Sequence, residues 1–219
     1  MQLNGFFQRT GTPVPGRTLH LHGLLNPVNT QEPKAMTTQP TTRRIQMSET
    51  TLKSALQRAE HVFGKRPEMA KMQKVSTATV RGGTRCEFIE DDWRYGADMP
   101  EPMGGTASGP TPGTFIRAGL ATCLAVGYSM RAAYLGIPVR GIEVELRTAI
   151  DNRGLFCGQA EVPVYADIAY VVTVDSDAPQ ADIERLLDEA DERSPYLNLF
   201  RTPQKVRREI KVVRTAVAA

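Results

Sequence analysis

The three cysteines are the residues of this 219-residue sequence whose type could support covalent chemistry. Cys86, Cys123 and Cys157 are separated by more than thirty residues each, form no CxxC pair and are odd in number. These features argue against a framework of structural disulfides, so we expect reduced thiols in a cytoplasmic compartment. An ionised cysteine is a nucleophile toward peroxides and disulfides, whereas a neutral buried cysteine only fills space.

Cys123 is the strongest candidate nucleophile because of the elements around it. Residues 109–113 form a loop of glycine, proline and threonine, and a helix is predicted from about Thr114 to Leu135, ended by Gly136-Ile137-Pro138. At roughly the third turn, the thiol lies beyond the strong part of the helix dipole, so it needs a nearby cation to ionise. On the residues alone, burial as a small apolar side chain of the helix is the favoured interpretation of this cysteine.

Other catalytic chemistries find little support in the sequence. The histidines, His20, His22 and His61, all lie outside the predicted core, so no metal site or histidine base is predicted there. There is no Walker loop, and Gly104-Gly105 is an isolated pair rather than a dinucleotide fingerprint. We therefore expect no cofactor and no metal.

The positive charge is concentrated at the N-terminus. The chain is +3 overall, but residues 1–47 carry +4 and the remainder −1. Nucleic acid is therefore not expected as a partner, with binding through the basic segment as an alternative. The longest apolar run, residues 118–130, is closed by Arg117 and Arg131 and is shorter than the roughly 20 residues of a membrane span. No membrane association is expected.

The chain is predicted to consist of a flexible extension and one folded domain. Residues 1–46 are rich in Thr, Pro, Gln and Asn and show no sustained periodicity. The domain covers residues 47–219, with an amphipathic leading helix over 48–63 and a core over about 75–213.

Alternating polar and apolar residues predict strands on both sides of the central helix. Before the helix, we expect a hairpin near 75–81 and 84–90 and then a loop over 91–113. After it, the prediction has strands at 139–150, about 155–162 and 168–174, a helix capped within 175–177 and ended by Ser194-Pro195, and a terminal strand at Lys205–Val213. Because the strands cluster rather than alternate with helices, the sequence favours an α+β fold.

The order and spacing of several short motifs resemble the OsmC/Ohr superfamily. Over roughly residues 75–213 these motifs are Gly104-Gly105, Gly109-Pro110-Thr111-Pro112, Ala121-Thr122-Cys123, Gly136-Ile137-Pro138, the strand with Glu143 and Glu145, Asp151-Asn152-Arg153-Gly154, residues 174–178 and Ser194-Pro195. The resemblance implies an OsmC-like fold, with antiparallel sheets around a long central helix. It also implies an intertwined homodimer with active sites at the interface.

The activity that the resemblance implies is reduction of organic hydroperoxides by a thiol. In this family a cysteine on the central helix attacks the peroxide, an arginine keeps it ionised, a glutamate holds the arginine, and a second cysteine before a proline closes a disulfide. Cys123 matches the first cysteine. Ser194 stands where the second cysteine is expected, and Thr114 stands where the glutamate usually is. A threonine can cap the helix but cannot hold an arginine by charge.

The arginine has competing placements. Arg94 is preferred, because it lies between two aromatic residues in the loop that approaches the helix, where it can be desolvated and oriented. Arg85 or Arg81, on the hairpin beside Gly82-Gly83, is the alternative. Each of these arginines could also be a solvated surface charge.

The sequence thus predicts a one-cysteine reaction, in which an organic hydroperoxide oxidises Cys123 to a sulfenic acid and an external thiol recycles it. Cys86 and Cys157 could resolve that sulfenic acid, but structural burial in predicted strands is favoured for both. The alternative is a non-catalytic OsmC-fold protein that binds a small apolar or thiol ligand at the dimer interface.

Overall fold

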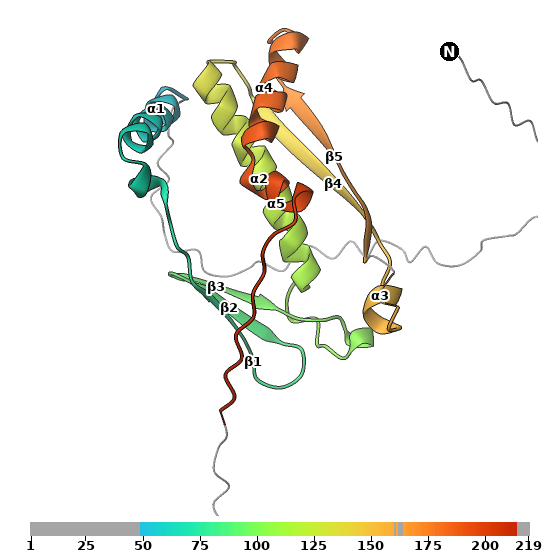
Figure 1. Cartoon of the computed structure of the whole chain (residues 1–219). Helices are drawn as coiled ribbons and strands as arrows, with labels where there is room; N and C mark the ends of the chain where they lie inside the picture. The colour runs from blue at the N-terminus through green and yellow to red at the C-terminus, as the bar shows by residue number, and fades with distance from the viewer. Residues whose placement is uncertain (1–48, 160, 162–163, 214–219) are drawn as a thin grey trace, which may run out of the picture. The chain divides into compact units, whose positions relative to one another are not determined.

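The computed structural model describes residues 49–159, 161 and 164–213 (Figure 1). The expected flexible extension, residues 1–46, lies outside the described residues. The elements in chain order are α1 (Glu49–Lys65), η1 (Pro67–Ala70), β1 (Ser76–Val80), β2 (Cys86–Glu90), β3 (Trp93–Ala97), η2 (Glu101–Met103), α2 (Pro112–Leu135), β4 (Gly141–Ile150), α3 (Arg153–Phe156), β5 (Tyr165–Asp175), α4 (Gln180–Arg193) and α5 (Pro195–Arg201).

The ends of the central helix α2 are specified by local chemistry. Thr111 is the N-cap, and its side-chain oxygen accepts a hydrogen bond from the amide of Thr114. Pro112 occupies the first turn, where the missing amide hydrogen has no helical partner to lose. Gly136 ends the helix in the left-handed region, with a φ of 71° that favours glycine. The predicted helix is confirmed, and it starts two residues earlier than expected.

The core lies along one face of α2. Leu120, Leu124, Tyr128 and Ala132 follow each other at intervals of four residues, which places them on one side of the helix, and all are buried. They pack with the following buried or half-buried residues of the loop after α2, of α4 and α5, and of β4 and β5: Ile137, Leu186, Ala190, Leu197, Ile142, Val144, Leu146, Tyr170 and Val172. Although α2 is apolar, no helix in the described part of the chain is long and apolar enough to cross a bilayer.

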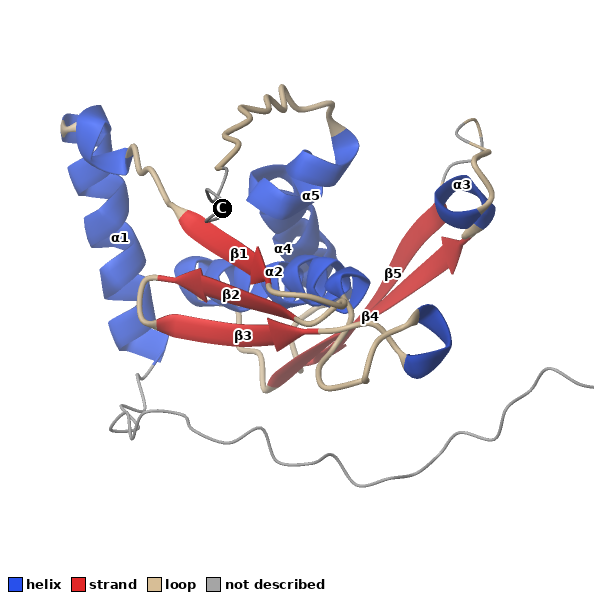
Figure 2. Ribbon diagram, turned by 90° about the horizontal axis from the view of Figure 1, so that it is seen from below, coloured by secondary structure: helices blue, strands red, loops and turns tan. Residues whose placement is uncertain are grey.

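The strands form two antiparallel sheets (Figure 2). The first has the order β1-β2-β3, with Ser76 opposite Glu90 and Cys86 opposite Ala97. The second pairs β4 with β5, starting where Gly141 lies opposite Asp175. The predicted hairpin before α2 and the predicted α+β class, with antiparallel sheets around a long helix, are confirmed.

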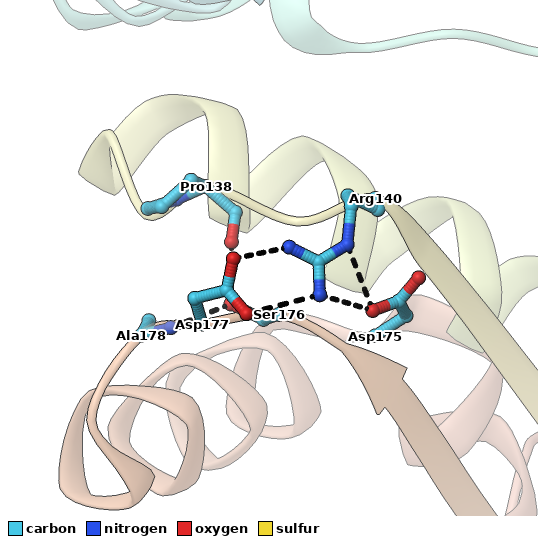
Figure 3. A network of polar contacts seen from close by, with 6 residues as sticks. All are labelled: Pro138, Arg140, Asp175, Ser176, Asp177 and Ala178. Carbon is cyan, nitrogen blue, oxygen red and sulfur yellow. Dashed lines mark hydrogen bonds and ion pairs between the residues drawn. The ribbon is translucent and has the colours of Figure 1, made fainter.

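A polar cluster around Arg140 joins the ends of β4 and β5 (Figure 3). The guanidinium forms ion pairs with Asp175 and Asp177, including a hydrogen bond of 2.9 Å from Nε to Asp175. Ser176 donates a hydrogen bond to the carbonyl oxygen of Pro138. The predicted capping residues of the next helix therefore serve a different purpose, and α4 begins later without a side-chain cap.

A third strand follows the first hairpin, where the sequence predicts a loop over 91–113. Asp91 reverses the chain with a positive φ of 50°, and β3 then pairs with β2 along its whole length. Trp93 and Tyr95 belong to the aromatic residues that favour strands, and their rings stack with centroids 6.3 Å apart. The loop prediction is wrong for these residues. The polar residues 91–92 form only a tight turn, and the strand β3 that follows pairs with β2.

Two predictions in the C-terminal half are also wrong, those of strands over 155–162 and 205–213. In place of a strand over 155–162, the described residues contain the short helix α3, and β4 pairs directly with β5. The predicted end of α4 at Ser194-Pro195 is confirmed, and the same residues also start α5, since Ser194 Oγ accepts a hydrogen bond of 3.2 Å from the amide of Leu197. Residues 205–213 form no strand within the described structure. A strand requires a hydrogen-bonding neighbour, which this segment does not find here.

Candidate functional site

Cys123 is half-buried on α2 and lines a pocket of about 730 Å³ that is bounded by α1, α2, α4 and α5. The apolar part of the wall includes Leu56, Val126, Met130, Ala190 and Pro195. The polar part includes Glu60, Arg131, Tyr134, Arg193 and Ser194. The thiol is therefore not sealed within the core, and a small molecule that enters this pocket can reach it.

Ser194 is the polar residue in contact with the thiol. Its Oγ lies 3.9 Å from Cys123 Sγ, and the residue is only 6% exposed. The same oxygen accepts the capping hydrogen bond from Leu197 described above. A hydroxyl group has one hydrogen to donate in addition to its acceptor sites, so Ser194 can cap α5 and donate to the sulfur at the same time.

Two guanidinium groups line the same pocket. Arg131 lies about two turns beyond Cys123 on α2, pairs with Glu189, and stands 4.8 Å from the centroid of the Tyr134 ring. Burial lowers the pKa of Arg131, and the positive charge of Arg193 lowers it further. Arg193 lies 3.9 Å from the Glu189 carboxylate, so the two arginines share this acid.

Sequence reasoning did not find these two arginines. The available signal for Arg131 was a charged residue that ends the apolar run of the central helix. Its proximity to Arg193 depends on how α4 packs against α2, and no local pattern encodes that packing.

The arginines selected from the sequence lie elsewhere in the chain. Arg94 is on β3, is 68% exposed in its side chain, and lies 3.5 Å from Glu87 on β2. Arg85 is exposed in the turn between β1 and β2. Neither lines the Cys123 pocket. Thr114 lies in the first turn of α2, where its hydroxyl accepts a hydrogen bond of 3.3 Å from Arg117. Roles for Arg94, Arg85 and Thr114 at the thiol stay predictions.

The other two cysteines are free and differ in environment. Cys157 is exposed just after α3, so its predicted burial in a strand is wrong. Cys86 is half-buried on β2, as predicted, and lines a second pocket of about 590 Å³. That pocket lies between the three-stranded sheet, α2 and α5, and its aromatic lining consists of Phe88, Tyr95, Phe115, Tyr196 and Phe200. Within the described residues, no group of three or more potential ligands could hold a metal ion.

A hydrogen-bonded carboxylate fixes the loop that leads into α2. Asp98 is 1% exposed and accepts hydrogen bonds of 2.7 to 3.2 Å from the hydroxyls of Thr84, Thr106 and Ser108 and from the amides of Met99, Thr106 and Ser108. The hydroxyls of Thr84 and Thr106 have the largest effect in holding the pKa of this carboxyl group far below its usual range, against the opposing effect of burial. Sequence reasoning gave Asp98 no role.

Two glycines of the family motifs are required by the same loop. A Cβ atom at Gly105 would collide with the backbone of Met99, and one at Gly109 would lie 2.7 Å from the carbonyl oxygen of Gly96. Both positions need the close backbone approach that only glycine permits. These motifs therefore shape the entry to α2.

Replacing Asp98 with asparagine is expected to lower the free energy of unfolding at pH 7, because an amide cannot accept all these hydrogen bonds. A carboxyl group with a depressed folded-state pKa stabilises the fold above its unfolded pKa of about 3.9 and loses that effect as pH falls below it. The difference from wild type should therefore shrink between pH 5 and pH 3 in urea denaturation. An equal difference at both pH values would contradict the assignment, and the exposed Asp92→Asn is the control.

A second buried network positions α4, which carries part of the pocket wall. The hydroxyls of Tyr128 on α2 and Tyr170 on β5 donate hydrogen bonds of 2.6 and 2.5 Å to the carboxylate of Asp191. Burial, followed by the hydrogen bond to Asp191, raises the pKa of both tyrosines. Both hydroxyls therefore remain donors, and they hold α4 in place shortly before Arg193 and Ser194.

Comparisons with known proteins agree with the motifs. Residues 105–209 match the sequence model of a family described as OsmC-like protein, so the resemblance is confirmed. An OsmC-like protein from Mycoplasma pneumoniae is similar in structure, with a TM-score of 0.52, 17% identity, and coverage of 60% of this chain and 89% of that chain. The fold is therefore OsmC-like. Curated protein sequences give no match.

Two further solved structures have lower TM-scores. The organic hydroperoxide resistance protein OsmC from Legionella pneumophila gives 0.43 at 19% identity, covering 59% of this chain and 90% of that chain. The organic hydroperoxide resistance protein OhrB of Bacillus subtilis gives a TM-score of 0.41 at 22% identity, covering 59% of this chain and 91% of that chain.

Proposed function

Because residues 105–209 form an OsmC-like domain, we propose that this protein is a thiol peroxidase of the one-cysteine type, with Cys123 as the reacting residue and organic hydroperoxides as substrates. The observation that carries the proposal is the placement of the Cys123 thiol on the wall of a pocket of about 730 Å³. An apolar wall suits the organic part of a hydroperoxide, and a reachable thiol suits attack on its oxygen.

The proposed reaction has two steps. The Cys123 thiolate attacks one peroxide oxygen, the O–O bond breaks, and the leaving alkoxide takes a proton to become an alcohol, which leaves Cys123 as a sulfenic acid. Two external thiol groups then reduce the sulfenic acid to the thiol, with release of water and formation of their own disulfide. The three free cysteines support a reducing, cytoplasmic setting in which such thiols are available.

The pocket offers groups that favour an ionised sulfur. The Ser194 hydroxyl, 3.9 Å away, can donate a hydrogen bond to a thiolate, and a bond to a charged acceptor is stronger than one to a neutral acceptor. The positive charges of Arg131 and Arg193 line the same pocket and attract a negative charge within it. Arg94, Arg85 and Thr114 are proposed to act only if a second chain brings them to this pocket.

The proposal is tested by the intact mass of the protein after one equivalent of a linear alkyl hydroperoxide. We expect a gain of about 16 Da, the mass of one oxygen, located by peptide mapping at Cys123 and removed by dithiothreitol. An unchanged mass, or oxidation confined to Cys86 or Cys157, would disprove it.

We further propose that the protein is an intertwined homodimer. Residues 205–213 find no strand partner in the described structure, although Val206 is 90% exposed, Ile210 is 69% exposed and Val212 is exposed as well. In an extended chain, Val206, Ile210 and Val212 fall on one face, which they share with Arg208, so this face is mainly apolar. The open edges of the two sheets offer main-chain partners for such a strand.

If residues 205–213 pair with a second chain, charged substitutions on their apolar face should dissociate the dimer. Ile210→Lys combined with Val212→Lys should convert a particle of twice the chain mass into a monomer in light scattering, because burying an unpaired charge at an interface is unfavourable. The matched control is Lys205→Ala with Arg207→Ala, on the other face of the segment. A wild-type monomer, or equal effects of both pairs, would refute the proposal.

A second candidate function is binding of an apolar ligand without catalysis. The pocket of about 590 Å³ favours this function, because aromatic rings line that pocket and Cys123 is not among its lining residues. This function predicts that Cys123→Ser leaves the binding of an apolar fluorescent probe unchanged, whereas Phe115→Ala, in the pocket wall, weakens it. If neither variant changes the binding, the second candidate is eliminated.

A further inference from the structure

Helix α1 supplies part of the Cys123 pocket although it lies outside the residues that match the OsmC-like family. Its Leu56 and Glu60 line the pocket, whereas the family match covers residues 105–209. The remaining lining residues come from α2, α4 and α5 and the residue that joins α4 to α5. The pocket is thus built from the family domain on most sides and from an added helix on one.

The apolar face of α1 rests on α2 without deep burial. Leu52, Leu56, Ala59 and Val62 recur at helical spacing and are half-buried, and no residue of α1 whose burial is described is fully buried. In Figure 1, α1 stands to the left of α2 and α4 to its right. Helix α1 packs against α2 and lines the same pocket as residues 122–134 of α2. The distance between the two helices therefore affects how much room a molecule has in the pocket that contains Cys123.

A side-chain contact ties α1 to the polar end of the pocket. The hydroxyl of Tyr134 on α2 donates a hydrogen bond of 2.7 Å to Glu60 Oε2. The ring of the same tyrosine lies 4.8 Å from the guanidinium carbon of Arg131, which in turn pairs with Glu189 on α4. The contact therefore connects α1, through α2, to the helix on the other side of the pocket.

We propose that α1 is a specificity-determining element of the thiol site: Leu56 limits the width of the pocket beside Cys123, and the hydrogen bond from Tyr134 to Glu60 holds α1 at that distance. This inference rests on the proposed function, because it concerns molecules that react at Cys123. Slender alkyl hydroperoxides are admitted, and hydroperoxides with a bulky group next to the reacting oxygen are disfavoured. The selection is steric, since the wall that surrounds the thiol is mainly apolar.

The test compares the rates at which a small and a bulky reagent alkylate Cys123 in the full chain. Iodoacetamide is the small reagent and fluorescein-5-maleimide the bulky one, with peptide mapping to separate Cys123 from Cys86 and Cys157. We expect Leu56→Ala to raise the bulky-to-small rate ratio by roughly tenfold, the lower range of discrimination by a change of this size in an apolar pocket. Leu56→Trp should lower the same ratio, which keeps the test informative if the alanine variant loosens the helix.

Two further variants separate the hydrogen bond from the packing. Tyr134→Phe keeps the ring beneath Arg131 but loses the hydroxyl, so it should raise the ratio by a few-fold, as expected for one hydrogen bond. Arg58→Ala changes an exposed residue of α1 that does not line the pocket, and it should leave the ratio at the wild-type value.

The inference is overturned if neither Leu56 variant changes the ratio by more than twofold, or if Arg58→Ala changes it as much as they do. Its failure is distinct from failure of the proposed function. If the wild-type protein consumes no hydroperoxide but the bulky-to-small alkylation ratio changes in the Leu56 variants, the role of α1 stands and the peroxidase proposal fails. If the protein consumes hydroperoxide but the alkylation ratio does not change in the Leu56 variants, the peroxidase proposal stands and the role of α1 fails.

Discussion

Replacing Cys123 with serine is expected to abolish the consumption of organic hydroperoxide. A serine hydroxyl is neither ionised at neutral pH nor oxidised to the sulfur species that the reaction requires. Loss of a nucleophile lowers turnover by several orders of magnitude, so we expect a decrease of at least about 10³-fold. The measurement is consumption of a linear alkyl hydroperoxide at pH 7 with dithiothreitol as reductant. The fold should survive, because the side chain is only half-buried and the two residues differ by one atom.

The other two cysteines are the matched controls. Cys86→Ser and Cys157→Ser should each retain most of the activity, because Cys86 lines a different pocket and Cys157 is exposed beyond α3. If the Cys123 variant still consumes hydroperoxide at the wild-type rate, the thiol of Cys123 is not the reacting group. If the Cys86 variant loses as much activity as the Cys123 variant, a two-cysteine reaction replaces the one proposed here.

Replacing Ser194 with cysteine is expected to change the reaction from a one-cysteine to a two-cysteine type. The Ser194 hydroxyl oxygen lies 3.9 Å from Cys123 Sγ, so the two side chains are in contact, and we expect the new thiol to approach to the roughly 2.05 Å that a disulfide needs between its sulfurs. After one equivalent of hydroperoxide, the variant should lose about 2 Da from the disulfide rather than gain about 16 Da. Its Cys123 should then become unreactive toward iodoacetamide until dithiothreitol is added.

The control for this variant is Ser194→Ala, which removes the hydroxyl and cannot form a disulfide. It should still gain the mass of one oxygen on oxidation. It should be less stable by about 1 kcal/mol, because α5 loses the side-chain acceptor at its first amides. A Ser194→Cys protein that gains an oxygen without any disulfide would show that the two side chains do not meet in solution.

The cation that would favour a thiolate at Cys123 can come from two places. Arg131 and Arg193 belong to the same chain and line the pocket. Arg94 and Arg85 are exposed on the three-stranded sheet, and a partner chain would have to carry them to the thiol. The two origins are compatible with the same reaction, but only the second makes activity depend on the dimer.

The sequence alone determined the features that depend on neighbouring residues. Helix α2 was predictable because its N-cap, its proline in the first turn and the terminal Gly136 are all local signals. The strands of the first hairpin and β4 followed from alternation of polar and apolar residues with a period of two. The position of Cys123 on α2 could also be read from the chain, but its choice as the reacting residue rested on the family resemblance.

Only the tertiary structure decided which distant residues meet. Ser194 lies 71 positions from Cys123 and contacts it because α5 packs against α2. The sequence analysis placed Ser194 only by resemblance, although Ser194-Pro195 carries the same local helix-start signal as Thr111-Pro112. Arg131, Arg193 and Glu60 come together because three helices enclose one pocket, and Asp98 gains its hydrogen bonds from a loop that folds back on it. Local propensity specifies dihedral angles, whereas such contacts depend on the packing of whole elements, which a single sequence does not display.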